Sequence, residues 1–346
     1  MNRWREQIHF CAAGGAATLL LIFTGLAAAA PSGFVYTANE RDASISEITL
    51  ATGAVRTFKA SVMAHNVQVT PDGRYLLVVG MPVSGDQMQT MKEVSGGEQG
   101  SLLIFDVRHL ERPVATLPTG KDPAHVVTDR EGRRAFVTNS KDNAITVFDL
   151  TQRTVTGTIG TGAAPHGLRP SPDGRELYVA DVADDSVSVI DTTTLKEVAR
   201  LPVGKAPVQV GFTPDGSQAY VSLRDENKVA IIDVATRRVV AKVDVGRNPI
   251  QVFGTPDGKR MYVANQGSEA VPDDRASVID VASRTVIATV TTGSGAHGVV
   301  VGDGGATAFI TNIGAGTVSA VDTASQRVTA TFKVGSGPNG ISYRRQ

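Results

Sequence analysis

One unit of sequence recurs along almost the whole chain. Short apolar runs mark its copies, and the runs at residues 136, 178, 220 and 262 begin 42 residues apart. One unit is longer by about 17 residues and another by about 5. A repeat of this length predicts stacked copies of one supersecondary unit, because a single copy cannot bury its apolar face alone. The seven runs are Tyr36–Asn39, Leu77–Gly80, Phe136–Asn139, Tyr178–Asp181, Tyr220–Leu223, Tyr262–Asn265 and Phe309–Asn312.

Each unit carries the signals of four short β-strands. Most runs follow a turn that closes on glycine, as in Thr70–Gly73, where proline fixes one φ and glycine accepts a positive φ. Alternating segments such as Val187–Asp191 and Glu197–Gly204 follow, without a helical period. An aspartate usually ends the third strand, and we expect its carboxylate to accept hydrogen bonds from the next turn. These aspartates are Asp106, Asp149, Asp191, Asp233, Asp280 and Asp322.

Seven four-stranded units predict an all-β fold, a seven-bladed β-propeller of four antiparallel strands per blade. The first run has no room for a preceding strand, whereas Gly337–Tyr343 supplies one, so N- and C-terminal segments should complete one blade. The Tyr-Val-x-Asn runs with Pro-Asp-Gly turns resemble the YVTN family of β-propeller repeats. That resemblance implies the fold, while propellers serve binding, scaffolding, redox and hydrolytic functions.

The first thirty residues are typical of a secretory signal peptide. Arg3 and Arg5 precede an apolar stretch that ends in Ala27–Ala30. An uncleaved membrane anchor is the alternative, but the purely apolar core over residues 16–26 is shorter than the ~20 residues that a span needs. We therefore expect a signal peptide over 1–29, one propeller domain over 30–346, and a periplasmic or secreted protein. Cleavage removes Cys11 and Trp4, which excludes disulfides, thiolate metal sites and covalent c-type haem from the mature protein.

Histidines provide the sharpest functional pattern. His65, His166 and His297 occupy the same position of their repeats, on blades two, four and seven, and His125 lies one residue out of register. Loop order places them at one end of the channel. Imidazoles converging there could bind zinc, copper or iron, including haem iron. The alternative is that they are polar loop caps bonded to neighbouring backbone, in a channel too wide for three rings to meet.

Two insertions are predicted at the same end. The longer, from Met81 to Gly100, contains Met81, Met88 and Met91, and thioether plus imidazole is a ligand set for Cu(I). The alternative is a cover or partner-binding loop. The shorter insertion, Gln266–Arg275, carries Glu269, Asp273 and Asp274, which we expect to be solvated loop charges.

Three functions remain compatible with these patterns. The first is a non-enzymatic scaffold that binds a small molecule or a protein through the insertion-bearing face. The second is a redox-linked metal-binding protein, and the third is a lactonase-like hydrolase, which would need a carboxylate-lined metal centre. No catalytic residues are assigned. With 34 basic and 34 acidic residues and no long run of either sign, we expect no nucleic-acid partner, no membrane partner after cleavage, and a monomer.

Overall fold

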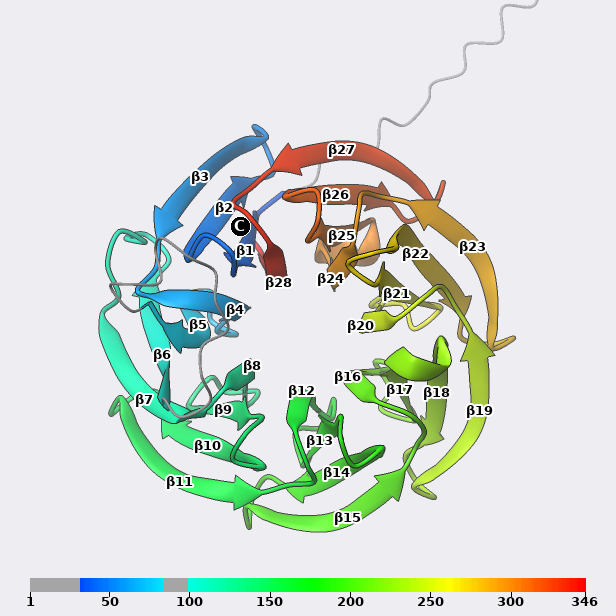
Figure 1. Cartoon of the computed structure of the whole chain (residues 1–346), viewed down its shortest axis with the longest axis horizontal. Helices are drawn as coiled ribbons and strands as arrows, with labels where there is room; N and C mark the ends of the chain where they lie inside the picture. The colour runs from blue at the N-terminus through cyan, green and yellow to red at the C-terminus, as the bar shows by residue number, and fades with distance from the viewer. Residues whose placement is uncertain (1–31, 84–98) are drawn as a thin grey trace, which may run out of the picture. The chain divides into compact units, whose positions relative to one another are not determined.

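The computed structural model describes residues 32–83 and 99–346. In this part of the chain the strands form seven four-stranded antiparallel sheets around a central axis (Figure 1). The all-β, seven-bladed propeller predicted from the repeats is therefore confirmed. The predicted signal peptide lies outside the described residues. No helix in the described ranges is long and apolar enough to span a membrane.

Each blade runs outward from an innermost strand that lines the central axis (Figure 1). The innermost strands, from blade two to blade seven and then blade one, are β4 (Val62–Val69), β8 (Pro123–Thr128), β12 (Pro165–Pro170), β16 (Pro207–Phe212), β20 (Pro249–Gly254), β24 (Ala296–Val301) and β28 (Pro338–Arg344). The second strands, from blade one, are β1 (Phe34–Asn39), β5 (Tyr75–Pro82), β9 (Arg134–Asn139), β13 (Glu176–Asp181), β17 (Gln218–Leu223), β21 (Arg260–Gly267) and β25 (Thr307–Asn312).

The third and outermost strands complete the blades. The third strands are β2 (Ser44–Thr49), β6 (Gln99–Asp106), β10 (Ala144–Asp149), β14 (Ser186–Asp191), β18 (Lys228–Asp233), β22 (Pro272–Asp280) and β26 (Thr317–Asp322). The outermost are β3 (Ala54–Lys59), β7 (Ala115–Lys121), β11 (Thr154–Gly160), β15 (Lys196–Pro202), β19 (Arg238–Asp244), β23 (Thr285–Thr291) and β27 (Arg327–Lys333). Two short 3₁₀ turns, η1 (Arg224–Glu226) and η2 (Asp303–Gly305), lie in loops.

Blade one joins the two ends of the described chain. Its strand order is β28-β1-β2-β3, with Phe34 opposite Arg344 and Tyr36 opposite Ser342. The red β28 and the blue β1 lie side by side in Figure 1. The predicted closure of one blade by both terminal segments is confirmed, and it pairs the edge that β1 would otherwise expose.

The third residue of the repeated run connects neighbouring blades. In blade three, the backbone N–H of His125 donates to Thr138 Oγ1 at 3.0 Å, and this hydroxyl donates to the carbonyl of His166 in blade four at 2.6 Å. Ser222 makes the same two contacts from blade five to blade six, to Gln209 N and the carbonyl of Ile250. One hydroxyl thus satisfies two buried backbone groups and fixes the inner strands relative to each other.

Every innermost strand contains a β-bulge near its beginning. The pairing shifts between Ala64 and Asn66 in β4, between Pro123 and Val126 in β8, and between Pro165 and Leu168 in β12. The same irregularity recurs in the other four inner strands. A bulge places two residues of one strand opposite one residue of the other and re-aims side chains, so simple alternation no longer decides which way a residue faces.

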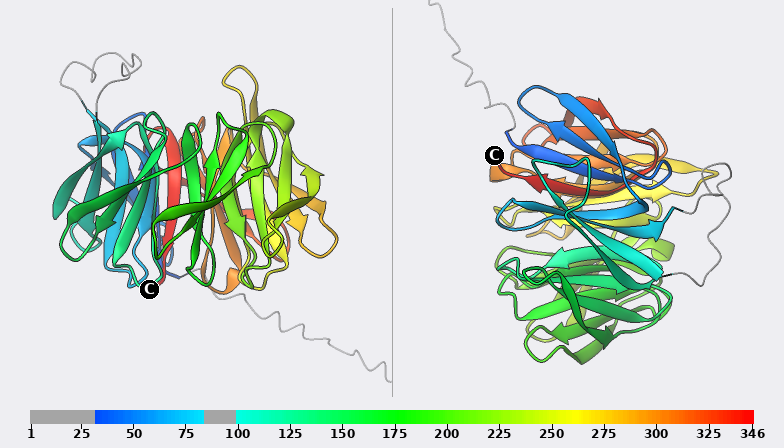
Figure 2. Two further views of the ribbon diagram at one scale, coloured as in Figure 1. Left: turned by 90° about the horizontal axis from the view of Figure 1, so that it is seen from below. Right: turned by 90° about the vertical axis from the view of Figure 1, so that its left-hand side faces the viewer.

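The shorter insertion forms a hairpin rather than a loose loop. Strands β21 and β22 extend to the pair Gly267–Pro272, and this hairpin projects from the end of the propeller opposite the C-terminus (Figure 2). Asp273 is 1% exposed and pairs with Arg275 at 2.7 Å. The expectation that Asp273 is solvated is wrong, because extension of the sheet buries it between arginines.

The third-strand aspartates act as turn caps, as predicted. Asp233 Oδ1 accepts hydrogen bonds from Thr236 N and Thr236 Oγ1, and Asp280 Oδ1 does the same with Ser283. These carboxylates therefore fix the turn into the outermost strand, which explains why they recur in most blades.

Candidate metal centre

Three histidines from adjacent blades meet at one end of the channel. His65 lies on β4, His125 on β8 and His166 on β12, and one nitrogen from each lies within 4.8 Å of the others. Their ring centroids are 4.7–6.1 Å apart. The innermost strands start at this end, because the first residue of each pairs with the last residue of the second strand, as Pro123 does with Asn139. Because the three nitrogens lie so close together, the channel is narrow enough at this end for three imidazole rings to meet.

The bulges explain why His125 joins this group despite its offset in the repeat. His65, His125 and His166 each lie within the irregular segment of their inner strand. Since two successive residues of a bulge face a single partner residue, a one-residue offset does not reverse the side on which a ring lies.

His65 is oriented by a carboxylate. Its Nδ1 lies 3.0 Å from Glu40 Oε1, and Glu40 is itself held by Asn339, whose Nδ2 donates to Oε2 at 2.7 Å. The carboxylate accepts the proton of Nδ1, which leaves the lone pair on His65 Nε2. Metal-ligating imidazoles usually donate their second ring N–H to a carboxylate, a backbone carbonyl or water, and His65 has such a partner in Glu40.

His166 is oriented in the same sense by a backbone carbonyl. Its Nδ1 lies 3.3 Å from the oxygen of Val208, and its Nε2 lies 3.4 Å from Nε2 of His65. Both Nε2 atoms carry lone pairs in these tautomers, so they repel each other unless a cation or a proton lies between them. Two nitrogens of a tetrahedral zinc site, each about 2.05 Å from the ion, are about 3.3 Å apart.

His125 contributes a buried nitrogen without a partner. The residue is 3% exposed, its Nδ1 lies 3.4 Å from Gln209 Nε2, and its Nε2 has no hydrogen-bond partner among the described residues. A buried polar atom left unpaired costs about 1–3 kcal/mol. A bound ion in the site would remove that cost.

The charge states favour neutral ligands beside one cationic position. Burial lowers the pKa of His166 to about 3, with His65 and His297 adding to the effect, and it lowers the pKa of His125 well below 6.5. Burial would also lower the pKa of His65, but the charge and hydrogen bond of Glu40 outweigh it and raise this pKa. Burial opposes ionisation of Glu40, yet His65 and Asn339 hold the pKa of Glu40 at about 2.

The remaining predicted ligands are placed differently. His297 is buried, its Nδ1 contacts the carbonyl oxygen of Asn339 at 3.1 Å, and it is not among the three histidines whose nitrogens converge. Met81 pairs with Met63 in the β4–β5 ladder, beyond the bulge that holds His65. Met88 and Met91 lie outside the described residues.

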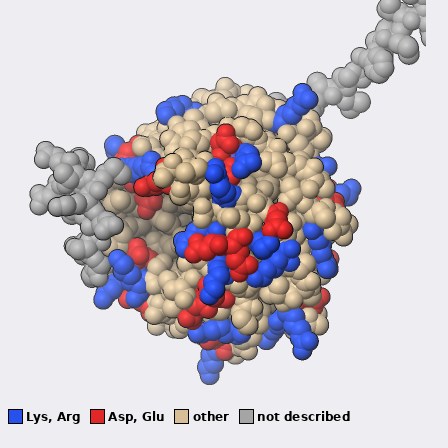
Figure 3. All heavy atoms as spheres, turned by 45° about the vertical axis from the view of Figure 1, so that its right-hand side comes forward, with Lys and Arg blue, Asp and Glu red and all other residues tan. Residues whose placement is uncertain are grey.

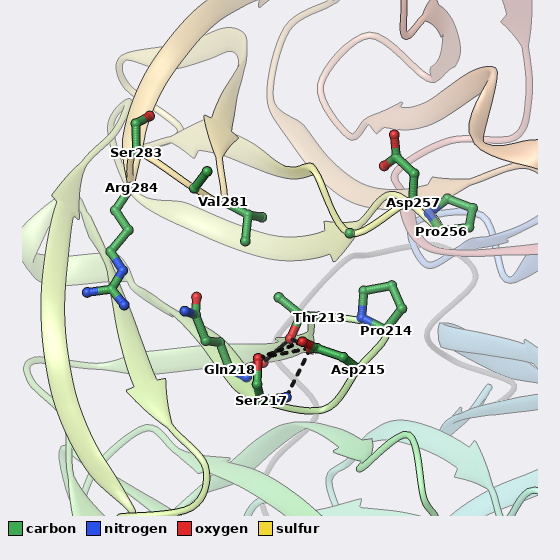
Figure 4. Close-up of a pocket in the computed structure, with 12 residues that line it drawn as sticks. Thr213, Pro214, Asp215, Ser217, Gln218, Pro256, Asp257, Val281, Ser283 and Arg284 are labelled. Carbon is green, nitrogen blue, oxygen red and sulfur yellow. Dashed lines mark hydrogen bonds between the residues drawn. The ribbon is translucent and has the colours of Figure 1, made fainter.

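Hollows also occur at the opposite end of the propeller, between neighbouring Pro-Asp-Gly turns. One of 680 Å³ is lined by Thr213, Asp215, Asp257 and Arg284 (Figure 4), and one of 640 Å³ occupies the equivalent position one blade earlier. Asp215 already accepts hydrogen bonds from Thr213 Oγ1 and from Ser217 of its own turn. Because these grooves recur with the repeat and their carboxylates serve the turns, the histidine cluster is the stronger candidate site.

Comparison with known proteins supports the fold assignment. A model described as "YNCE-like beta-propeller" matches residues 114–253, which lie within the seven-bladed body. This match, together with the seven blades, supports a YVTN-like β-propeller. None of the curated proteins matches it.

Solved structures similar to this YVTN-like propeller share its fold at low sequence identity. A putative 6-phosphogluconolactonase from Bacteroides uniformis has a TM-score of 0.73 and 17% identity, over 91% of this chain and 100% of that one. A functionally unknown protein from Desulfotomaculum acetoxidans has a TM-score of 0.71 and 15% identity, over 91% and 99%. A chain of Kuenenia stuttgartiensis hydrazine synthase has a TM-score of 0.68 and 20% identity, over 81% and 89%.

Sequence reasoning missed the residues that orient the imidazoles. Glu40 follows the first apolar run and Asn339 occupies the histidine position of blade one, so the polar residues at equivalent positions were the available signal. Beyond the centre, cationic and anionic side chains of this YVTN-like propeller are interspersed in the view of Figure 3. Pairs such as Arg200–Asp184 and Lys242–Glu226 show that loop charges neutralise one another.

Proposed function

We propose that this protein is an exported metal-binding propeller that holds one transition-metal ion between His65, His125 and His166. The observation that carries the proposal is the 3.4 Å separation of two Nε2 atoms whose rings are each oriented through Nδ1. When His65 has released its Nε2 proton, this arrangement directs two lone pairs toward the same point. The predicted signal peptide supports export, and the proposed location of the mature protein is the periplasm or the outside of the cell.

The donor set selects a class of ion. Three neutral imidazoles without thiolates suit zinc, copper, iron or nickel rather than calcium or magnesium, which prefer oxygen ligands. With three protein ligands, a fourth position stays open for water or another small ligand, as in catalytic rather than structural zinc sites. The carboxylate-lined centre that a lactonase-like function requires does not match this group, because Glu40 uses its oxygens on His65 and Asn339.

The test is elemental analysis of the chain expressed with its own leader and purified from the exported fraction without a histidine tag. We expect about one equivalent of a transition metal per chain. His125→Ala and His166→Ala should lose it. His109→Ala is the matched control, because His109 is exposed and bonded through its backbone to Asp106 in another loop.

A second control tests whether metal loss is specific to His65, His125 and His166 or follows from any histidine change at this end of the channel. His297→Ala should retain the metal, since His297 contacts Asn339 and not the three converging nitrogens. Far-UV circular dichroism checks that each variant is folded. Absence of metal from the wild-type protein after incubation with Zn²⁺ and Cu²⁺ would refute the proposal. It would leave the scaffold hypothesis, to be pursued through partners of the 81–100 segment.

A further inference from the structure

The channel continues beyond the histidines into a separate cavity. Its volume is about 220 Å³, and inner-strand side chains such as Gln68, Arg169, Gln251 and Ser342 line it. His125 also lines it, so the cavity begins where the candidate metal centre ends. At about 30 Å³ per liquid water, the space admits a small organic molecule rather than a polymer.

Arg169 brings a cation into this cavity without a counter-charge. The residue lies on β12, three positions after His166, and among the described residues no carboxylate or other acceptor contacts its guanidinium. Burial lowers its pKa to about 10, so it stays charged at neutral pH. The ring of Phe253 lies beside it, with its centroid 5.1 Å from the guanidinium carbon.

Gln251 adds a second donor without an acceptor. Its Oε1 accepts a hydrogen bond from Val299 N at 3.2 Å, which assigns the amide orientation. The residue is 4% exposed, and its Nε2 has no hydrogen-bond partner in the described part of the chain. A fixed amide donor and a guanidinium that both lack acceptors make the cavity complementary to an anion.

Apolar surface surrounds the other side of Arg169. A neighbouring hollow of 280 Å³ shares Arg169 and Phe253 with the channel cavity and adds Phe212 and Pro214. The intervening inner strand β16 has Gly211 at this level, so no side chain separates Arg169 from Phe253. A ligand bound to Arg169 in the channel cavity therefore has the aromatic ring of Phe253 beside it.

We propose that the channel cavity binds a small organic carboxylate, whose oxygens accept hydrogen bonds from Arg169 and Gln251 and whose apolar body packs against Phe253. A guanidinium presents paired N–H groups that match a planar carboxylate, which favours this anion over a halide. The site uses none of the three proposed metal ligands to hold the carboxylate. The carboxylate site and the metal centre can therefore be tested independently.

Isothermal titration calorimetry with acetate, benzoate and phenylacetate tests the proposal on the purified full chain. We expect saturable binding, tighter for the two aromatic acids, and no binding of the neutral analogue phenylacetamide. Arg169→Gln should weaken binding about 10- to 100-fold, as expected for losing a charged hydrogen-bonding partner. Arg175→Gln is the control, since Arg175 is exposed on the next turn of the same blade.

A second variant tests the amide without disturbing the fold. Gln251→Glu keeps the oxygen that accepts the hydrogen bond from Val299 N. It replaces the unpaired N–H donor by a second carboxylate oxygen, so binding of a carboxylate ligand should be lost. His166→Ala should bind phenylacetate like the wild type, which separates this site from the metal proposal.

Three results would overturn the inference. They are no saturable binding of any of the three acids up to about 10 mM, equal binding of phenylacetamide, and unchanged affinity in Arg169→Gln. Tighter binding of inorganic phosphate than of every carboxylate would also overturn it, in favour of an oxyanion site.

Discussion

Asp181 occupies a position where four other blades have asparagine. In blade three, Asn139 Nδ2 donates to Thr146 Oγ1 at 2.8 Å. In blade four, Asp181 Oδ2 instead accepts from Ser188 Oγ at 2.7 Å, while the same hydroxyl lies 2.9 Å from Glu197 Oε1. One hydroxyl proton cannot serve both carboxylates, and Asp181 Oδ1 is buried without a partner. We predict that Asp181→Asn stabilises the protein.

The magnitude follows from the ionisation of this side chain. Burial is the main cause that raises the pKa of Asp181 from 3.8 to about 6, and the residue is fully buried. A shift of about two units corresponds to about 3 kcal/mol. Because the folded state keeps its proton longer than the unfolded chain, the free energy of unfolding falls as pH rises from about 4 to about 6, and stays lower above that. An asparagine at this position cannot ionise, so the fall in the free energy of unfolding between pH 4 and 6 disappears. Ser188 is then free to donate its proton to Glu197.

Thermal unfolding followed by far-UV circular dichroism across pH 4 to 8 measures the effect. At pH 8 the Asp181→Asn variant should be more stable by about 3 kcal/mol, with a Tm higher by roughly 5 °C. Near pH 4 the two proteins should differ little, because Asp181 is then protonated in the folded protein and about half protonated in the unfolded chain. The reciprocal variant Asn139→Asp should lose stability at pH 8 and retain it near pH 4.

Two results would refute this reasoning. One is equal stability of Asp181→Asn and wild type at pH 8. The other is a stability difference that does not change with pH, since desolvation of a carboxylate must act only where the carboxylate is ionised.

Two further predictions concern the histidine cluster. Between about pH 4.5 and 6.5 only His65 must release a proton for metal to bind, because the pKa values of His125 and His166 are depressed. Metal affinity, measured by competition with a chromophoric chelator, should therefore fall about tenfold per pH unit as pH is lowered, and a thousandfold dependence would contradict the assigned pKa directions. Thr138→Val removes the hydroxyl that joins His125 N to the His166 carbonyl and should cost about 1–3 kcal/mol in urea unfolding, whereas Thr138→Ser should restore stability. A Thr138→Val variant as stable as wild type would show that this bridge contributes nothing.

The repeat made the fold predictable, whereas the site depended on irregularity within the repeat. Turn glycines, alternating strands and the unpaired first run specify seven closed blades because each is a local signal that recurs. The set of converging histidines was not predictable in the same way. Equal spacing favoured His65, His166 and His297, but the inner-strand bulges bring His125 to His65 and His166 instead. A bulge is set by backbone pairing, which residue spacing does not reveal.

The orienting contacts were hidden for a related reason. Glu40 reaches His65 from blade one, and Gln209 reaches His125 from blade five, so each contact joins segments far apart in sequence. Asp273 shows the same limit, because its burial depends on how far β21 and β22 continue to pair. Local patterns identify strands and turns, but these contacts exist only after the ring has closed.

Departures from the repeat in blade four place chemistry on one side of the channel. Equivalent positions on seven inner strands would carry equivalent residues if packing alone mattered, and most at the level of Val210 and Val252 are indeed buried aliphatic residues. Blade four keeps this pattern at Leu168, but it also carries His166 in its bulge and Arg169 at the channel cavity. A propeller needs neither for closure, since blades five and six close with aliphatic residues, glycine and phenylalanine at those positions. The proposed metal ion and carboxylate would supply the partners that His125 Nε2 and Gln251 Nε2 lack among the described residues.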